Sequence, residues 1–148
     1  MRHFILLFAM LMVFTPKGFS QEQGTLTLII DSVPSTKGSL YIALYKRSAD
    51  FLKDEGIFIG DVVKVTQAGK QEWVRENLDY DQYAIAIYHD VNDNGEMDKN
   101  LWGVPKEPYA FSKKEPSKWR SPAFEEVAFR MDSPDKKIIT SLELWKDR

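Results

Sequence analysis

The stretch Tyr83-Ala-Ile-Ala-Ile-Tyr-His-Asp90 alternates in the way that a half-buried β-strand does. Tyr83, Ile85 and Ile87 fall on one face of such a strand, and two small alanines fall on the other face. Successive side chains of a strand point to opposite sides of its sheet, so the larger apolar residues would pack on a core. The stretch therefore predicts a β-strand.

Short β-rich runs of the same kind occur on both sides of this strand, whereas helical periodicity is nearly absent after residue 20. Together with the first stretch, the predicted strands cover residues 25–30, 40–45, 62–66, 72–74, 83–89, 124–131 and 138–145. About seven strands at this spacing predict an all-β fold, a single antiparallel β-sandwich of immunoglobulin-like or transthyretin-like type.

The connections between these strands also have recognisable patterns. Ala68-Gly69-Lys70 favours a hairpin turn between two of the strands, and the segment from Ser48 to Gly56 favours a short helical stretch. Residues 90–122 hold four prolines and lack strand alternation, so they are expected to form one long loop. Loops of that length in a compact domain are uncommon and are often functional.

Leu78 followed by Tyr83 at the start of a strand resembles the tyrosine corner of Greek-key sandwiches, where the phenol ties the incoming loop to the strand. The alternative is a tyrosine that covers the edge of the core.

The first twenty residues have the pattern of a secretory signal peptide. Arg2 is followed by an apolar run over residues 4–14. In Gly18-Phe19-Ser20, small residues occupy the positions that a signal peptidase reads. The run is too short to span a bilayer, which needs roughly 20 residues. We expect residues 1–20 to be a signal peptide and residues 21–148 to be one domain with no transmembrane segment, exported to the periplasm or the cell exterior.

Composition excludes several classes of protein. Without Arg2 and Lys17, 18 basic residues remain against 22 acidic ones, a net charge of −4 that argues against nucleic acid binding. The absence of cysteine from the sequence excludes disulfides, thiol nucleophiles and an anchor through a lipidated cysteine.

The stretch Asp90-Val-Asn-Asp-Asn-Gly-Glu-Met-Asp98 places oxygen-bearing side chains at its first, third, fifth and ninth positions, with glycine at the sixth. Ca²⁺ prefers such oxygen ligands, so the stretch predicts a calcium loop. The predicted ligands are the side chains of Asp90, Asn92, Asn94 and Asp98 and the carbonyl of Glu96. Position twelve is Leu101 rather than glutamate, so the loop is not an EF-hand, and we expect weak binding with a Kd of ~10⁻⁴ to 10⁻³ M.

The alternative for this stretch is a polar turn without metal. Asn and Asp side chains accept hydrogen bonds from the backbone two residues on, and Asn94-Gly95 favours a turn by itself.

The long loop also combines aromatic and basic residues. Trp102, Tyr109 and Trp119 would provide platforms for a glycan or a peptide, and a glycan or a cell-envelope protein would then be the partner. The alternative is that these rings pack onto the edge of the sandwich. A third hypothesis is a hydrolase centred on His89 and Asp90. The alternative is that His89 has no catalytic role and only forms a hydrogen bond with the neighbouring loop.

The C-terminal half of the chain carries a series of short motifs in a specific order. They are Tyr83-Ala-Ile-Ala-Ile-Tyr-His-Asp90, Asn92-Asp-Asn-Gly95 with Asp98, Gly103-Val-Pro-Lys-Glu107, Tyr109-Ala-Phe-Ser112 and Pro122-Ala-Phe-Glu-Glu-Val-Ala-Phe129. In these motifs the chain resembles a family of exported bacterial proteins, the domain of unknown function numbered twenty-one forty-one. The resemblance implies an exported single-domain β-sandwich, and it implies no reaction and no catalytic residues. Our first hypothesis is therefore a non-enzymatic exported β-sandwich with a calcium-stabilised loop.

Overall fold

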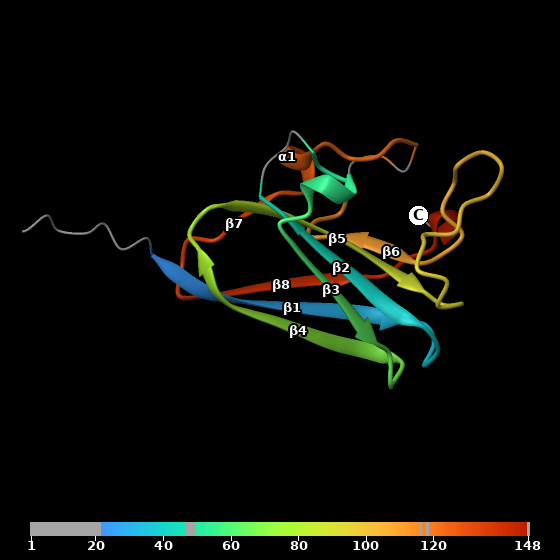
Figure 1. The fold of residues 1–148 in the computed structure, drawn as a ribbon, viewed down its shortest axis with the longest axis horizontal. Coiled ribbons are helices and arrows are strands. Elements are labelled where there is room, and N and C mark those ends of the chain that lie inside the picture. Colours follow the sequence, from blue (N-terminus) through green and yellow to red (C-terminus); the bar gives the residue numbers. More distant parts are fainter. Residues whose placement is uncertain (1–21, 47–49, 116, 118, 148) are drawn as a thin grey trace, which may run out of the picture.

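The computed structural model describes residues 22–46, 50–115, 117 and 119–147, and within them eight strands form two packed sheets (Figure 1). The expected all-β sandwich is confirmed. The predicted signal peptide lies outside the described residues. Among the residues described, no helix is both long and apolar enough to cross a membrane.

The first sheet has three strands in the order β4-β1-β8, namely β4 (Gly69–Asp79), β1 (Gln23–Val33) and β8 (Asp135–Ser141). β1 runs antiparallel to β4 but parallel to β8, which corrects the expectation of a wholly antiparallel sandwich. The start of β8 lies beside the start of β1. There the carbonyl of Pro134 accepts a 2.7 Å hydrogen bond from the amide of Thr25.

The second sheet has the order β3-β2-β5-β6, with a fifth short strand paired to β5. Its strands are β3 (Ile59–Lys64), β2 (Ser39–Tyr45), β5 (Gln82–Asp90), β6 (Tyr109–Phe111) and β7 (Phe129–Arg130). β6 lies within the stretch that was expected to be one long loop, so the loop is divided in two. The predicted hairpin at residues 68–70 is also wrong, because β3 and β4 belong to different sheets.

The predicted strand over residues 124–131 is wrong in its first half, which forms the single helical turn α1 (Phe124–Val127). Phe124 and Val127 are both buried at helical spacing, and the Glu126 carboxylate accepts a 2.7 Å hydrogen bond from the Ala123 amide at the start of the turn. Two 3₁₀ turns complete the fold, η1 (Asp54–Gly56) and η2 (Trp145–Asp147). The short helical stretch expected between Ser48 and Gly56 is therefore confined to η1 within the described residues.

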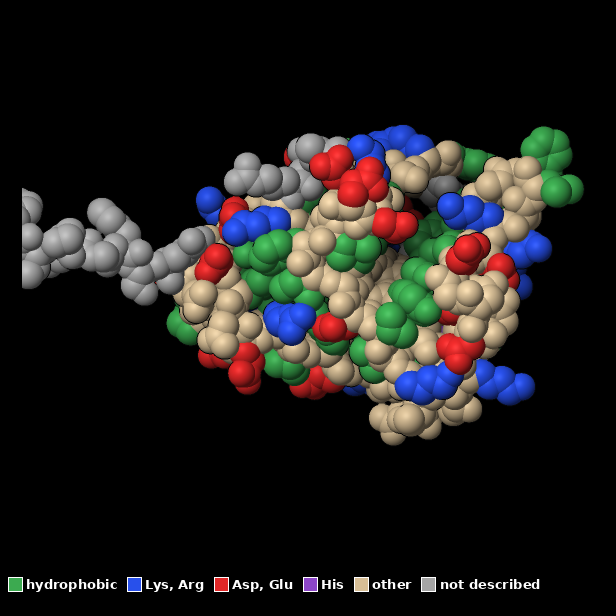
Figure 2. All heavy atoms as spheres, in the orientation of Figure 1, with side chains coloured by type: hydrophobic (Ala, Val, Ile, Leu, Met, Phe, Trp, Pro, Cys, Tyr) green, Lys and Arg blue, Asp and Glu red, His purple; other side chains and the backbone are tan. Residues whose placement is uncertain are grey.

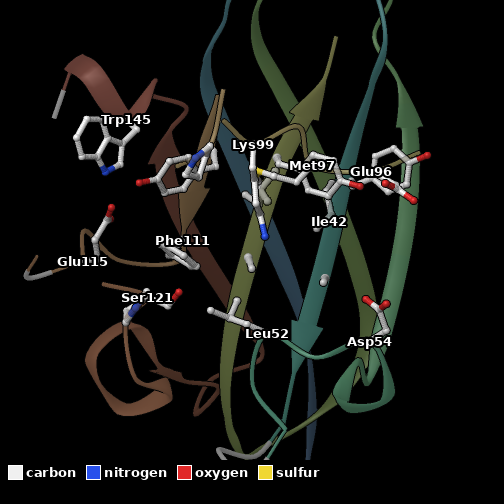
Figure 3. Close-up of a pocket in the computed structure, with 18 of the residues that line it drawn as sticks. Ile42, Leu52, Asp54, Glu96, Met97, Lys99, Phe111, Glu115, Ser121 and Trp145 are labelled. Carbon is white, nitrogen blue, oxygen red and sulfur yellow. The ribbon is translucent and has the colours of Figure 1, made fainter. Parts of the chain in front are cut away.

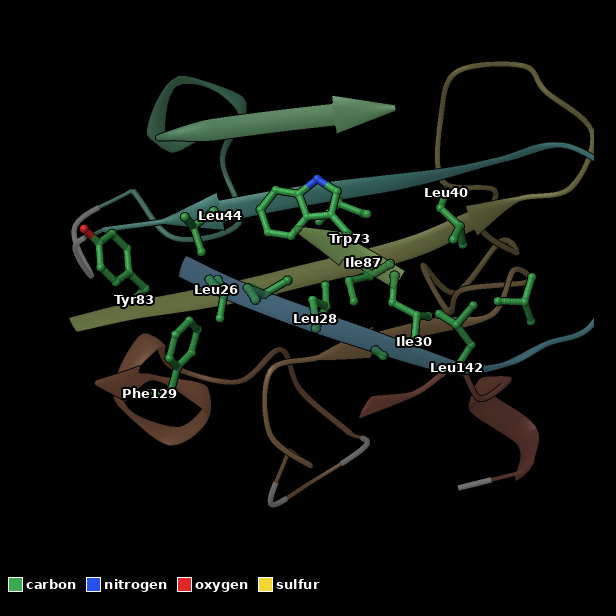
Figure 4. Packing of buried hydrophobic residues seen from close by; sticks show 14 of the residues in the cluster. Leu26, Leu28, Ile30, Leu40, Leu44, Trp73, Tyr83, Ile87, Phe129 and Leu142 are labelled. Carbon is green, nitrogen blue, oxygen red and sulfur yellow. The ribbon is translucent and has the colours of Figure 1, made fainter. Parts of the chain in front are cut away.

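The main core fills the space between the sheets (Figure 4). Alternate residues of β1 and β2 face it, and Trp73 on β4 lies over them. A second apolar cluster covers part of the outer face of the five-stranded sheet, where Tyr45 and Phe111 pack against Phe124 and Val127 of α1. The loops therefore add a third layer on this face, and they leave a groove between them.

Candidate functional site

The groove has a floor of small residues that runs across the strands of the five-stranded sheet. Ala43 on β2 pairs with Gly60 on β3 and with Ala86 on β5, and Ala86 pairs in turn with Phe111 on β6. Neighbouring strands lie about 4.8 Å apart, so Gly60, Ala43 and Ala86 form a trough about 10 Å long that ends at the ring of Phe111. All four residues line a groove of about 1240 Å³, larger than the roughly 300–1,000 Å³ typical of small-ligand pockets.

An aromatic row borders this floor two residues further along the strands. Tyr41, Tyr88 and Tyr109 are paired across β2, β5 and β6, and they line the groove. The rings of Tyr41 and Tyr88 are stacked, with centroids 4.8 Å apart and planes 13° apart. Tyr45 lies on the opposite side of the floor, so the trough runs between aromatic side chains.

The phenol of Tyr88 donates its single proton to the neighbouring loop. Burial, followed by the effects of Tyr41 and of the Asp90 carboxylate, raises the pKa of Tyr88 to about 12. The phenol therefore keeps its proton at neutral pH, and it donates a 3.4 Å hydrogen bond to the Gly95 carbonyl. That bond joins the groove wall to the loop over residues 90–98.

The three aromatic residues predicted as platforms all line the groove. Trp102 and Trp119 are 88% and 78% exposed at its mouth, whereas Tyr109 is buried in the wall. Trp119 packs edge-to-face on Trp145, with ring centroids 5.4 Å apart. Exposed rings at an open groove are available to a ligand, so the prediction that rested on these residues remains in force.

Charged groups of both signs surround the groove (Figure 3). Asp54 and Glu96 stand on one side, and the Lys99 side chain reaches into the groove. On the opposite side, the Arg120 guanidinium holds the Glu126 carboxylate in a bidentate pair of 2.6 and 2.7 Å. The groove thus offers hydrogen-bond donors and acceptors with an excess of negative charge, because Asp54, Asp61, Glu96 and Glu115 line it against Lys99 and Arg120.

The predicted calcium ligands lie together in the loop over residues 90–98, but their oxygens bond to the loop itself. The fully buried Asp90 carboxylate accepts hydrogen bonds from the amides of Asn94 and Gly95, at 3.2 and 2.7 Å. The side-chain oxygens of Asn92 and Asn94 accept from backbone amides two residues on, and their nitrogens donate to Asp98.

This pattern is that of the metal-free polar turn. A calcium ion would need both asparagine amides to turn around, because nitrogen rather than oxygen faces the Asp98 carboxylate. Within the described residues, no group of three or more His, Asp or Glu side chains is placed to hold a metal. Oxygen ligands of the right kind lie in this loop, each engaged in hydrogen bonds within it, and calcium binding stays a prediction.

Glu107 is a second anchor of this loop that sequence reasoning did not single out. Its buried carboxylate accepts hydrogen bonds from the amides of Val91 and Asp98, at 2.9 and 3.1 Å, and so closes the loop at its base. The sequence signal for it was its place in the Gly103-Val-Pro-Lys-Glu107 motif. The groove floor had a signal too, since small residues on one face of a strand leave space there.

His89, the centre of the hydrolase hypothesis, points into the protein and is fully buried. Its Nε2 lies 2.7 Å from the Lys37 carbonyl, and its amide donates to the Pro108 carbonyl. A substrate could reach its ring only if the sandwich opened at this end. The groove and the histidine are separate features of the molecule.

Comparison with known proteins identifies the family of the chain. The family model DUF2141, described as an uncharacterized protein conserved in bacteria, matches residues 29–139, from β1 to β8. No curated protein and no solved structure is similar enough to the chain to count as a match. The matched segment includes the groove floor, the loop over residues 90–98 and Glu107, and on this evidence the chain belongs to the DUF2141 family of bacterial proteins.

Proposed function

We propose that this protein is an exported, non-enzymatic binding module that holds a glycan chain in the groove across its five-stranded sheet. The observation that carries the proposal is the trough of Gly60, Ala43 and Ala86, bordered by aromatic rings on both sides. The sequence patterns of a signal peptide and of aromatic platforms support the same function.

The chemistry of the groove suits sugar rings. A pyranose has apolar C–H faces that pack on aromatic rings, and hydroxyls at its edge that both donate and accept hydrogen bonds. The groove supplies the rings of Tyr88 and Phe111 and the Lys99 ammonium as a donor, and its rim supplies the carboxylates of Asp54 and Glu96 as acceptors (Figure 3). Because Lys99 offsets part of that negative charge, a neutral or weakly charged glycan fits better than a polyanion.

An extended peptide fits the floor less well. Peptides commonly bind sheets by adding a strand to a free edge, where backbone groups are unpaired. The floor lies mainly on β2 and β5, which are interior strands paired on both sides, so their backbone groups are already used. Recognition at this floor must rest on side chains and shape, which favours rings over a peptide backbone.

The proposal is tested by a substitution that fills the floor of the groove with a large side chain. Ala86→Phe places a ring in the trough, and aromatic residues are well accepted in strands. The matched control is Ile139→Phe, which adds a ring at a 63% exposed position of β8 on the other sheet. Binding of a panel of neutral and acidic oligosaccharides is measured by calorimetry for the wild type and both variants, after thermal melts have shown that they fold.

The expected result is that at least one oligosaccharide binds the wild type and the Ile139→Phe variant, and that Ala86→Phe loses this binding. If no glycan binds, or if Ala86→Phe binds as well as the wild type, the proposal is wrong. Peptides tested in the same way would show whether the groove instead belongs to the peptide-binding class that the sequence left open.

A further inference from the structure

The loop between β5 and β6 projects from the body of the molecule and carries hydrophobic side chains at its far end (Figures 1 and 2). Leu101 is fully exposed there, and its neighbour Trp102 is 88% exposed. Large apolar residues are commonly exposed one at a time, but two adjacent ones at the summit of a projecting loop form a distinct feature. We call Leu101 and Trp102 the apolar tip.

The turn beneath the apolar tip is closed by a dense set of hydrogen bonds centred on Asn100. The Asn100 side-chain oxygen accepts from the amides of Trp102 and Val104, at 2.9 and 3.0 Å. The Asn100 amide donates to the Val104 carbonyl, and its carbonyl accepts from Gly103, each at 2.9 Å. Gly103 adopts a φ of +76°, a conformation that favours glycine.

This bonding has two consequences for what the tip can contact. The backbone that carries the two apolar side chains is held in one conformation, so little backbone entropy is lost when the tip is buried. The backbone amides of Trp102, Gly103 and Val104 donate within the turn, and that of Lys106 donates to the Asp98 carbonyl. These paired amides can enter an apolar layer without the cost of unsatisfied donors.

The size of the tip favours a lipid surface over a protein. A stable protein interface buries about 800 Å² on each partner, far more than two side chains supply. Interfacial attachment to a membrane needs only a few apolar residues inserted about 5–10 Å, and tryptophan and leucine serve well at that depth. The exposed Lys106 flanks the turn at its base, where a long cationic side chain reaches anionic headgroups.

We propose that the apolar tip docks this protein on an anionic lipid surface, with Leu101 and Trp102 in the interface and Lys106 against the headgroups. The attachment is weak and reversible, because two side chains and one charge supply little binding energy. It is independent of the groove in one testable respect, since Trp102 lines the groove but Leu101 does not.

The experiment uses the purified protein with vesicles of pure phosphatidylcholine and of phosphatidylcholine mixed with phosphatidylglycerol. Cosedimentation measures binding, and brominated lipids measure the quenching of tryptophan fluorescence. The variants are Leu101→Ser at the tip and Lys106→Gln at its base. The matched control is Ile139→Ser, which removes an exposed apolar side chain from the three-stranded sheet.

Wild type and Ile139→Ser are expected to bind the anionic vesicles, and Leu101→Ser is expected to lower the affinity about tenfold. The Lys106→Gln variant should also bind less, and added salt should weaken binding by the wild type. Quenching by brominated lipid should be smaller in Trp102→Phe than in the wild type.

The proposal is overturned if the wild type does not bind anionic vesicles, or if Leu101→Ser binds them as well as the wild type. In the first of these cases a protein partner becomes the candidate for the tip. Because Leu101 lies outside the groove, Leu101→Ser should keep any glycan affinity, so failure of vesicle docking and failure of the proposed glycan binding are distinguishable.

Discussion

The phenol of Tyr83 donates a 2.9 Å hydrogen bond to the backbone carbonyl of Asp79, four residues earlier. Tyr83 is the second residue of β5 and is fully buried, whereas Asp79 ends β4 in the other sheet. The bond ties the connection between the two sheets to the strand that follows it. The tyrosine corner predicted from the sequence is thereby confirmed.

Tyr83→Phe should lower the free energy of unfolding by about 0.5–1.5 kcal/mol, because it removes this bond while keeping the ring in the core. Urea denaturation of both proteins measures the difference. Tyr80→Phe removes a hydroxyl at the same turn and should cost less. Equal stability of wild type and Tyr83→Phe would show that the corner contributes nothing.

The buried phenol of Tyr83 should also make the folded state less stable at alkaline pH. Burial, with smaller effects from Asp81 and Asp79, raises the pKa of Tyr83 to about 12. An unfolded tyrosine titrates near pH ~10, so the folded state holds the proton more tightly. This contribution is complete below about pH 10 and is lost as the pH rises through about 12. The unfolding free energy of the wild type should fall more steeply over that range than that of Tyr83→Phe.

The buried carboxylate of Asp90 should matter to the fold whether or not a metal binds. It accepts two backbone hydrogen bonds, and Asp90→Asn replaces one acceptor oxygen with a donor that faces an amide. We expect a cost of ~1–3 kcal/mol in urea denaturation with chelator present. Glu96→Gln, at an exposed position of the same loop, is the control and should be near neutral. A neutral Asp90→Asn would contradict this account of the loop.

Calcium binding is tested through Asp98 rather than Asp90, because loss of Asp90 would disturb the loop by itself. With a Kd of ~10⁻⁴ to 10⁻³ M, 10 mM calcium should stabilise the folded state by about 1–3 kcal/mol relative to chelator. A domain of this size should then melt several degrees higher. Asp98→Ala should abolish the shift. Superimposable melts of the wild type with calcium and with chelator would refute calcium binding.

The sequence predicted the strands well wherever one face is buried and alternation is clear. β2 and β5 were found almost to the residue, because Ile42 and Ile87 belong to regular apolar faces. β6 was missed because three consecutive buried residues, Tyr109 to Phe111, show no alternation. The partners of each strand were also beyond sequence reasoning, since a parallel and an antiparallel neighbour of β1 require the same residue pattern.

The candidate site was predicted in part for a similar reason. Trp102 and Trp119 were singled out by residue type, and they do lie at the groove. The floor of Ala43 and Ala86 depends on which residues become cross-strand neighbours, and register is a tertiary property. The asparagines of the loop fit a calcium motif and a polar turn equally well, because both uses need the same side-chain oxygens.

The ion pair between Arg120 and Glu126, at one wall of the groove, should persist as the pH is lowered into the acid range. The Arg120 guanidinium, followed by the Ala123 amide, lowers the pKa of Glu126 to about 2. A lowered pKa stabilises the folded state above the ordinary glutamate value of about 4.3, and this effect is lost as the pH falls through about 2. Between these limits the wild-type pair stays ionised and bonded.

Arg120→Gln should therefore raise the pKa of Glu126, measured by NMR titration of its side-chain carboxyl carbon. The control is Lys136→Gln, which breaks the separate pair with Asp132 on the other side of the fold and should leave Glu126 unchanged. Trp119 and Ser121 flank Arg120 and line the groove, so Arg120→Gln should also weaken glycan binding at pH 4 more than at pH 7. An unchanged pKa of Glu126 in Arg120→Gln would show that the guanidinium does not set it, and the wall would then depend on the Ala123 amide alone.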